Sequence, residues 1–225
     1  MNAHQDPVHC TPFLDLSFLE RDVATEERAD GSLLMRSRVP LGAVEAHLPA
    51  VLRRHAQSRP DRHWLLQRRE GHAGWLGLTY GQAGAQVDAV TQWLLDLGVP
   101  GRNVMVLSGN SLEHAVFELA AMQARMPYVP VTPAYSLLSN DHEKLRAMVA
   151  LIRPAVVLVQ EAARYQRALR AVLTPDVQVV HVSEPVDGLA STPWSELIAT
   201  PVGAAVQASV DAITPDTVAK YLFTS

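Results

Sequence analysis

One histidine and three carboxylates between residues 141 and 161 are the side chains that we consider first for acid–base or metal chemistry. His142 and Glu143 match the first two positions of the His-Glu-x-x-His zinc-protease motif, but Arg146 stands where the motif needs its second histidine. Asp141, Glu143 and Glu161 could pair as acid and base, yet each stands near a predicted helix start, where a carboxylate stabilises the helix dipole. We therefore interpret them as helix-end residues and expect no catalytic residue and no metal site within this chain.

Glycine-rich and nucleophile motifs are also incomplete. Gly71, Gly74 and Gly77 recur at intervals of three around a predicted hairpin, so they are interpreted as turn residues rather than as a dinucleotide-binding loop. The sequence holds no complete Walker loop and no Gly-x-Ser-x-Gly elbow. The residues alone therefore indicate neither a P-loop nucleotidase nor a serine hydrolase.

Composition and charge exclude several classes of protein. The 19 basic and 23 acidic residues give a net charge of −4, which does not favour binding to nucleic acid. No run of apolar residues is long enough to cross a membrane, and the first residues lack the pattern of a signal peptide. The lone Cys10 cannot form an internal disulfide, as is typical of a reducing compartment. We expect a cytoplasmic protein without a membrane span.

The first half of the chain predicts two antiparallel strand pairs. Phe18 to Val39 forms an N-terminal β-hairpin flap around a turn at residues 29–32, and His63–Arg68 pairs with Trp75–Thr79. A helix between the two pairs ends before Pro60. Thr79 and Gln82 then form a capping box at the start of a helix that ends near Gly98.

The second half alternates strands and helices, which predicts an α/β fold with a mostly parallel sheet and helices on both faces. The expected strands are Val104–Leu107, Tyr128–Val131, Ala155–Val159 and Val177–Val182. Three helices are expected between and after them: one that begins after an Asn110 cap, one from Ser139 or Asn140 to about Ile152, and one at Ala162–Leu173. Residues 184–215 are interpreted as a long surface connection with one short helix at Trp194–Ala199. Val218–Thr224 is again strand-like. We expect a flexible tail at residues 1–13 and one incomplete domain at 14–225.

Three blocks in fixed order carry a resemblance to a known family. They are Leu78-Thr79-Tyr80 with Gln82, Pro127–Val131, and Tyr221-Leu222-Phe223-Thr224-Ser225. Together they resemble the first signature blocks of the adenylate-forming (AMP-binding) superfamily of acyl-CoA synthetases, luciferases and peptide-synthetase adenylation domains. The extended second block, Pro127 to Leu138, is most similar to that of bacterial feruloyl-CoA synthetases. Arg125 stands where the family usually has a helix-ending glycine, so we expect an altered turn there.

The resemblance implies an AMP-forming acid:CoA ligase. Such enzymes use Mg²⁺ and ATP to convert a carboxylic acid, here a ferulate-like hydroxycinnamic acid, to an acyl-adenylate, and the thiol of CoA then displaces AMP. Thr224 and Ser225 match the first two positions of the family's ATP-phosphate loop. The family's other site residues and its C-terminal lid domain lie beyond Ser225. The resemblance therefore implies an N-terminal fragment, cut at the phosphate loop and inactive by itself.

Two other classes of function stay open. The chain could be a non-catalytic α/β ligand-binding module derived from a ligase, which equilibrium binding of an aromatic acid or a nucleotide would favour. It could also be an interaction subunit that complements a separately encoded C-terminal half, which a neighbouring reading frame beginning with the missing loop would favour. Within the ligases, a benzoate or medium-chain acid remains an alternative substrate.

Overall fold

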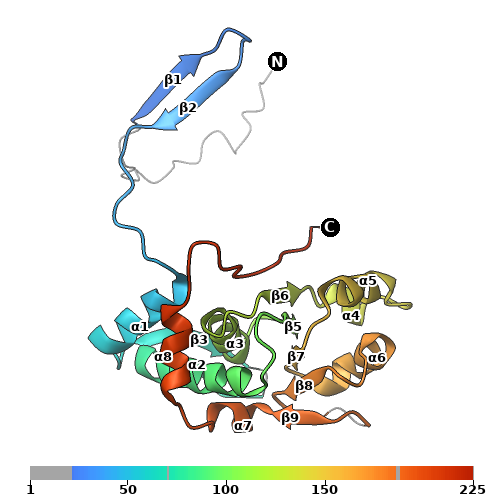
Figure 1. Cartoon of the computed structure of the whole chain (residues 1–225). Helices are drawn as coiled ribbons and strands as arrows, with labels where there is room; N and C mark the ends of the chain where they lie inside the picture. Colours follow the sequence, from blue (N-terminus) through green and yellow to red (C-terminus); the bar gives the residue numbers. More distant parts are fainter. Residues whose placement is uncertain (1–21, 70, 186–187, 225) are drawn as a thin grey trace, which may run out of the picture. The chain divides into compact units, whose positions relative to one another are not determined.

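The structure is a computed structural model that describes residues 22–69, 71–185 and 188–224. The chain separates into two compact units, residues 1–44 and 45–225, and each is described by itself (Figure 1). The predicted tail with Cys10, the first residues of the predicted hairpin and Ser225 lie outside the described residues.

The first unit contains the predicted β-hairpin. Strands β1 (Val23–Glu27) and β2 (Leu33–Ser37) pair in antiparallel register along their full length. In the turn between them Gly31 has a φ of +80°, which glycine adopts without steric cost. The Asp30 carboxylate accepts hydrogen bonds from the Ser32 hydroxyl, at 2.6 Å, and from the Ser32 amide, at 2.9 Å. These bonds, the hydroxyl first, lower the pKa of Asp30 and fix the turn.

The second unit begins as predicted, with helix α1 (Leu48–Ser58), the antiparallel strands β3 (His63–Arg68) and β4 (Trp75–Thr79), and helix α2 (Tyr80–Asp96). The capping box is confirmed. The Thr79 hydroxyl accepts from the Gln82 amide at 3.2 Å, and the Gln82 side chain accepts from the Thr79 amide at 2.9 Å. Two amides that the helix leaves unpaired are thereby bonded, so the chain turns from strand to helix at a defined residue.

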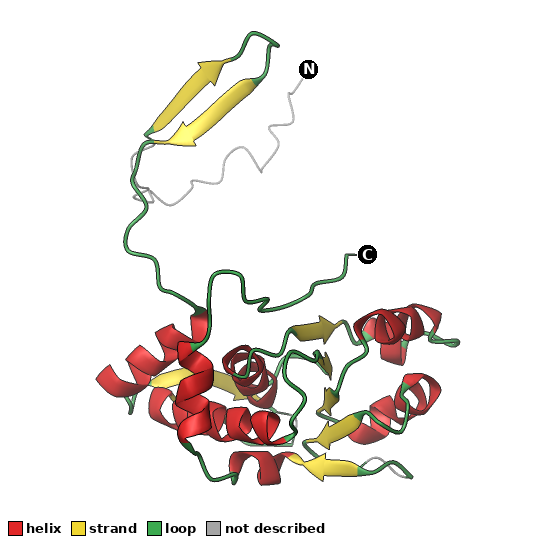
Figure 2. Ribbon diagram, viewed as in Figure 1, coloured by secondary structure: helices red, strands yellow, loops and turns green. Residues whose placement is uncertain are grey.

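A five-stranded parallel sheet forms the centre of this unit (Figure 2). Its strand order is β6-β5-β7-β8-β9, with bounds β5 (Val104–Leu107), β6 (Tyr128–Val131), β7 (Val156–Val159), β8 (Gln178–His181) and β9 (Ser191–Pro193). The first four strands agree with the predicted ones, whereas β9 was not predicted. Three residues are too few to show the periodicity of a strand.

Helices cover both faces of the sheet, which confirms the predicted fold class. They are α3 (Leu112–Gln123), α4 (Ala134–Leu137), α5 (Glu143–Ile152), α6 (Ala162–Val172), α7 (Trp194–Ile198) and α8 (Ala204–Asp211). Alternate residues of β5 point to opposite faces: Val104 and Val106 pack with α2, α3 and α7, whereas Met105 and Leu107 pack with α5 and α6. Both faces of the strand are buried because a helical layer lies on each.

Two predicted helix starts are wrong by a few residues. Helix α3 is capped by Ser111 rather than Asn110, because the Ser111 hydroxyl accepts from the His114 amide at 3.0 Å. The helix predicted from Ser139 or Asn140 begins at Glu143. The Ser139 hydroxyl accepts a hydrogen bond from the His142 amide at 2.9 Å. This bond resembles a helix cap, but it closes a turn that precedes the helix.

The prediction that residues 184–215 form a surface connection with one short helix is wrong. Helix α7 agrees with the predicted short helix, but α8 also packs on the domain, with Val206, Ser209 and Val210 buried. The Ser209 hydroxyl donates to the Gln123 carbonyl at 2.7 Å. Because small and polar residues interrupt its apolar stripe, the helical period of α8 is weak in the sequence.

Arg125 keeps the left-handed turn that the family's glycine predicts, with a φ of +55°, so the expected alteration of this turn is not found. Its Nε donates to the Ser209 hydroxyl at 3.3 Å. That contact to α8 offsets part of the steric cost of a side chain in the left-handed region.

Arg153 ends α5 in the same region, with a φ of +48°, and its exposed guanidinium makes no hydrogen bond within the described residues. We expect Arg153→Gly to raise the free energy of unfolding by about 1 kcal/mol, because a left-handed conformation costs an L-residue roughly 1–2 kcal/mol and the entropy of glycine offsets part of the gain. Urea denaturation measures the change. Arg125→Gly is the matched control and should gain less, because it loses the Ser209 bond. A less stable Arg153→Gly protein would show that this cap is not strained.

Candidate functional site

The order of the strands marks one position on the sheet where the direction of winding reverses. β5 pairs with β6 on one side and with β7 on the other. The connection from β5 to β6 runs through α3 on one face, and that from β7 to β8 runs through α6 on the opposite face. Ligands of open α/β sheets bind beyond the carboxyl ends of the strands at such a switch point. The candidate site is therefore the carboxyl edge of β5 and β7.

A cavity of about 130 Å³ opens at this switch point. Its lining comes from the segments after three strands: Ser108 and Gly109 after β5, Pro133 and Leu137 after β6, and Gln160, Glu161, Arg164 and Tyr165 after β7. The buried Ser108 hydroxyl donates to the Gln160 side chain at 3.4 Å, which joins the ends of β5 and β7. Burial raises the pKa of the Tyr165 phenol, so it stays a neutral hydrogen-bonding group.

The chain's last described segment runs beside β6, the edge strand next to β5. The Tyr128 amide donates to the Ala219 carbonyl at 3.0 Å, and the Tyr221 amide donates to the Tyr128 carbonyl at 3.0 Å. These bonds make a single parallel bridge between Tyr128 and Lys220 instead of the predicted strand Val218–Thr224. Figure 1 shows the segment in dark red, running in the direction of β6.

The segment runs parallel to β6 at the bridge, so the chain continues toward Thr224 in the direction of the carboxyl edge of the sheet. Within the described residues, the pairing itself ends at the bridge. Phe223 packs against the core on the α5 and α6 face. The Thr224 side chain is exposed and makes no hydrogen bond to any described residue. Ser225, the other predicted loop residue, lies outside the described residues, and phosphate binding by either residue remains a prediction.

Two residues that sequence reasoning did not single out, His114 and Glu118, lie beside the bridge. The Tyr128 hydroxyl makes a short hydrogen bond with Nε2 of His114, and Nδ1 of His114 bonds the Gly109 carbonyl at 2.9 Å. Glu118 lies 3.7 Å from the Lys220 ammonium. Burial, and secondly the charge of Glu118, raise the pKa of Tyr128. No motif spacing links these residues, because they meet only when α3 packs on β6.

His114, Glu118 and Tyr128 line a cavity of about 470 Å³. The other walls are provided by β3, by the loop between β5 and α3, and by Pro130 of β6. The nitrogens of His114 and the hydroxyl of Tyr128 already bond each other or the backbone. His114 and Tyr128 therefore serve to hold α3 and β6 together.

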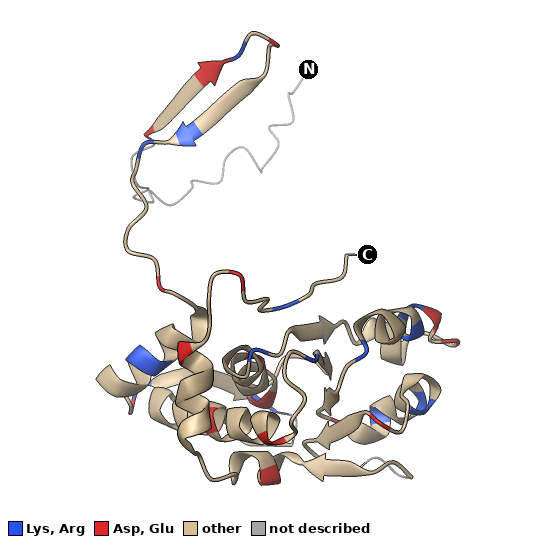
Figure 3. Cartoon of the chain, in the orientation of Figure 1, with Lys and Arg blue, Asp and Glu red and all other residues tan. Residues whose placement is uncertain are grey.

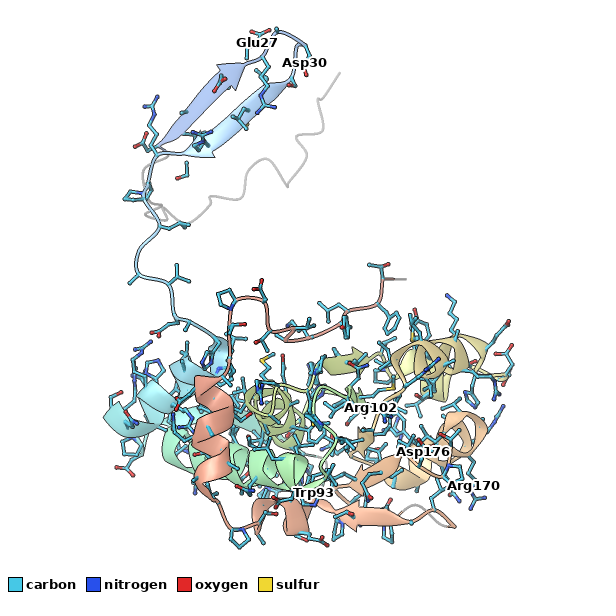
Figure 4. All side chains as sticks on the ribbon, in the orientation of Figure 1. Glu27, Asp30, Trp93, Arg102, Arg170 and Asp176 are labelled. Carbon is cyan, nitrogen blue, oxygen red and sulfur yellow. The ribbon has the colours of Figure 1, made fainter. Side chains whose placement is uncertain are left out.

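A larger cavity, of about 870 Å³, lies at the opposite edge of the sheet and includes Arg102 and Asp176, which Figure 4 labels. Arg102 donates to the Arg153 carbonyl at 3.1 Å, and Arg146 donates to the Ala171 carbonyl at 2.5 Å. These carbonyls end α5 and α6, where cations stabilise the helix dipole. Figure 3 shows both charge signs distributed along this unit. Helix capping accounts for these arginines, so the carboxyl edge remains the candidate site.

The carboxylates interpreted from the sequence as helix-end residues differ in their contacts. Asp141 accepts from the Glu143 amide at 3.1 Å and from the Ser139 hydroxyl at 3.1 Å, which lowers its pKa and confirms the helix-end role. Glu161 precedes α6 but makes no capping bond with its side chain, and it pairs with Arg164 at 2.6 Å. This exposed pair contributes little to stability.

The described part of the chain was searched for groups of metal ligands and for membrane-spanning helices. It contains no group of three or more His, Cys, Asp or Glu side chains arranged to hold a metal ion. None of its helices combines the length and the apolar character that crossing a membrane requires.

Comparison with known families and structures identifies the architecture. A family profile described as "AMP-binding enzyme" matches residues 52–225. Among solved structures, coronafacic acid ligase from Pectobacterium brasiliense, in its R395G form, is similar with a TM-score of 0.61 and 14% identity over 78% of this chain and 33% of its own. MbtA from Mycobacterium smegmatis has a TM-score of 0.58 and 23% identity over 79% of this chain and 31% of its own.

A third solved structure is the fatty acyl-adenylate ligase from L. pneumophila in complex with acyl adenylate and pyrophosphate. Its TM-score is 0.52, and it is 18% identical over 76% of this chain and 27% of its own. No curated protein sequence matches the chain at a significant level. At these identities the structural likeness shows the fold alone, and the chain spans about a third or less of the length of each of the three proteins.

The raised pKa of Tyr128 predicts how stability changes in alkali. The folded pKa is above the usual value of about 10, so the neutral phenol contributes stability that is present below pH 10 and is lost as the pH rises through the folded pKa. We expect Tyr128→Phe to make the loss of stability above pH 10 less steep and to remove one late step from the absorbance titration of the phenols. Tyr80→Phe is the matched control. An unchanged titration in Tyr128→Phe would contradict the assignment.

Proposed function

Because the chain belongs to the AMP-binding enzyme family, we propose that the protein containing these residues is an AMP-forming acid:CoA ligase. It transfers AMP from ATP to a carboxylic acid, releases pyrophosphate, and then passes the acyl group to the thiol of CoA. The observation that carries the proposal is the parallel bridge of Lys220 with Tyr128, after which the chain continues toward Thr224 in the direction of the carboxyl edge of the sheet. Nucleotide-binding proteins of this architecture use that edge.

The role of this chain in the reaction is to begin the phosphate-binding loop. Attack of the carboxylate on the α-phosphorus leaves negative charge on the phosphate oxygens, which preorganised donors stabilise. The exposed Thr224 hydroxyl is one such donor, and Ser225 supplies the next in the sequence pattern. Phe223 is packed against the core, so the loop begins from an anchored residue.

We further propose that the acid is a hydroxycinnamic acid such as ferulate. The support is the sequence block from Pro127 to Leu138, which resembles that of feruloyl-CoA synthetases. Pro133 and Leu137 of this block line the cavity at the switch point. The block thus lies close to the edge where ATP and the acid are proposed to meet.

ATP–pyrophosphate exchange tests the proposed activity and the acid. In the presence of ferulate, the protein encoded by the complete reading frame should catalyse the exchange of pyrophosphate into ATP. Adding CoA should yield feruloyl-CoA. Exchange with benzoate or a medium-chain acid, but not ferulate, would replace the proposed acid and keep the ligase. Binding of ferulate or ATP without any exchange would favour the non-catalytic module instead.

The polypeptide of residues 1–225 should catalyse neither step by itself, because it holds only Thr224 and Ser225 of the proposed loop. We expect no exchange and no thioester from the purified polypeptide with ferulate, Mg-ATP and CoA. Thioester formation by this polypeptide would overturn the expectation. Mixing it with a separately encoded C-terminal half and recovering activity would support the two-subunit alternative.

Removing the Thr224 hydroxyl tests its contact with phosphate. In the complete protein, Thr224→Val keeps the shape of the side chain and removes the donor, so kcat/KM for ATP should fall about 10- to 100-fold, the loss expected for one hydrogen bond to a charged group. Thermal unfolding should not change, because the side chain is exposed. Thr25→Val in the hairpin is the matched control. An unchanged kcat/KM would exclude Thr224 from the site.

A further inference from the structure

The segment that leads to Thr224 is held to the sheet by very little backbone pairing. Its two hydrogen bonds to Tyr128 form one bridge, and the neighbouring Val218, Tyr221 and Leu222 are exposed. A segment with so few backbone bonds, and with exposed residues around the bridge, specifies its register weakly. Side chains must therefore fix where this segment pairs.

Helix α3 provides a side chain to each member of the bridge. His114 bonds the Tyr128 hydroxyl, and Glu118 pairs with Lys220 at 3.7 Å. Residues four apart lie on the same face of a helix, so both contacts come from the face of α3 that borders the cavity of about 470 Å³. Tyr128 itself is 3% exposed, so the core fixes this member of the bridge, whereas the side chain of its partner Lys220 is partly exposed.

The same histidine connects the bridge to the switch point. The Gly109 carbonyl can only accept, so Nδ1 of His114 carries the hydrogen and Nε2 accepts from the Tyr128 hydroxyl. Gly109 also lines the small cavity at the ends of β5 and β7. One chain of hydrogen bonds thus runs from the candidate site through α3 to the residue that pairs with the terminal segment.

We propose that His114 and Glu118 form a clamp that fixes the register of residues 219–221 on β6 and so positions Thr224 for the phosphates of ATP. The second part of this proposal, the positioning of Thr224 for ATP, rests on the proposed function. A slip of one residue moves a strand by about 3.3 Å and turns each side chain to the other face. A hydrogen bond requires a separation of about 2.7–3.2 Å, so such a slip removes the Thr224 contact. His114, Glu118 and Tyr128 are positioning residues, because each acts on Thr224 through the segment at residues 219–221.

Hydrogen exchange of the Tyr221 amide tests the clamp without reference to activity. This amide is bonded to the Tyr128 carbonyl, so it reports the bridge. We expect exchange to be about two- to fivefold faster in Glu118→Lys and in Lys220→Glu, as for loss of a partly exposed ion pair, and up to about tenfold faster in Tyr128→Phe. The double variant Glu118→Lys with Lys220→Glu should restore slow exchange. Glu45→Lys, which breaks an ion pair with Arg54, is the matched control.

Steady-state kinetics of the complete protein test the positioning role. The single variants should raise KM for ATP severalfold and leave KM for the acid unchanged, and the charge-swapped double variant should recover the wild-type KM. Unchanged hydrogen exchange in all variants would overturn the clamp. Faster hydrogen exchange of the Tyr221 amide with an unchanged KM for ATP would overturn the positioning of Thr224. If the wild-type protein catalyses no pyrophosphate exchange with any acid, the proposed function is wrong, and so is the positioning of Thr224 for ATP. Hydrogen exchange of the Tyr221 amide still tests whether the clamp holds residues 219–221.

Discussion

The burial of β5 on both faces and both edges is the constraint on which the second unit depends. Val104, Met105, Val106 and Leu107 are all fully buried, and the strand pairs with β6 on one side and β7 on the other. A strand without any solvent contact requires helices on both faces and crossovers that begin at its carboxyl end. The loop at Ser108 and the start of α3 are therefore placed at one edge of the sheet by the same packing that forms the core.

Tyr128 connects that core to the candidate site in two independent ways. Its backbone amide and carbonyl bond residues 219 and 221, which continues the sheet beyond β6. Its side chain points to the face of α3, where the hydroxyl bonds His114. A residue in a strand presents its backbone to the neighbouring strand and its side chain to one face, so it can bond an adjacent segment and a covering helix together. Tyr128 thus couples the order of the terminal segment to the packing of α3.

The sequence predicts this fold well where the signal is local. The capping box of Thr79 and Gln82 and the apolar runs of the first four parallel strands depend on neighbouring residues, and the structure confirms them. Helix α8 was missed because its burial depends on distant contacts, such as the Ser209 bond to Gln123. Arg125 keeps a left-handed conformation for the same reason, since α8 provides a partner for its guanidinium. Tertiary contacts override local preference at both positions.

The candidate site was predictable only in its chemistry, not in its placement. The residue types of Thr224 and Ser225 indicate a phosphate contact through the family resemblance, but nothing in those residues determines where they lie. The direction in which the chain approaches Thr224 follows from Lys220, which pairs beside Tyr128 and close to Glu118, residues about a hundred positions earlier. Tyr128 belongs to the second signature block, but neither Lys220 nor Glu118 belongs to a motif that implies binding. A short polar motif therefore gains its chemical meaning from the strand and helix beside which the preceding residues pair.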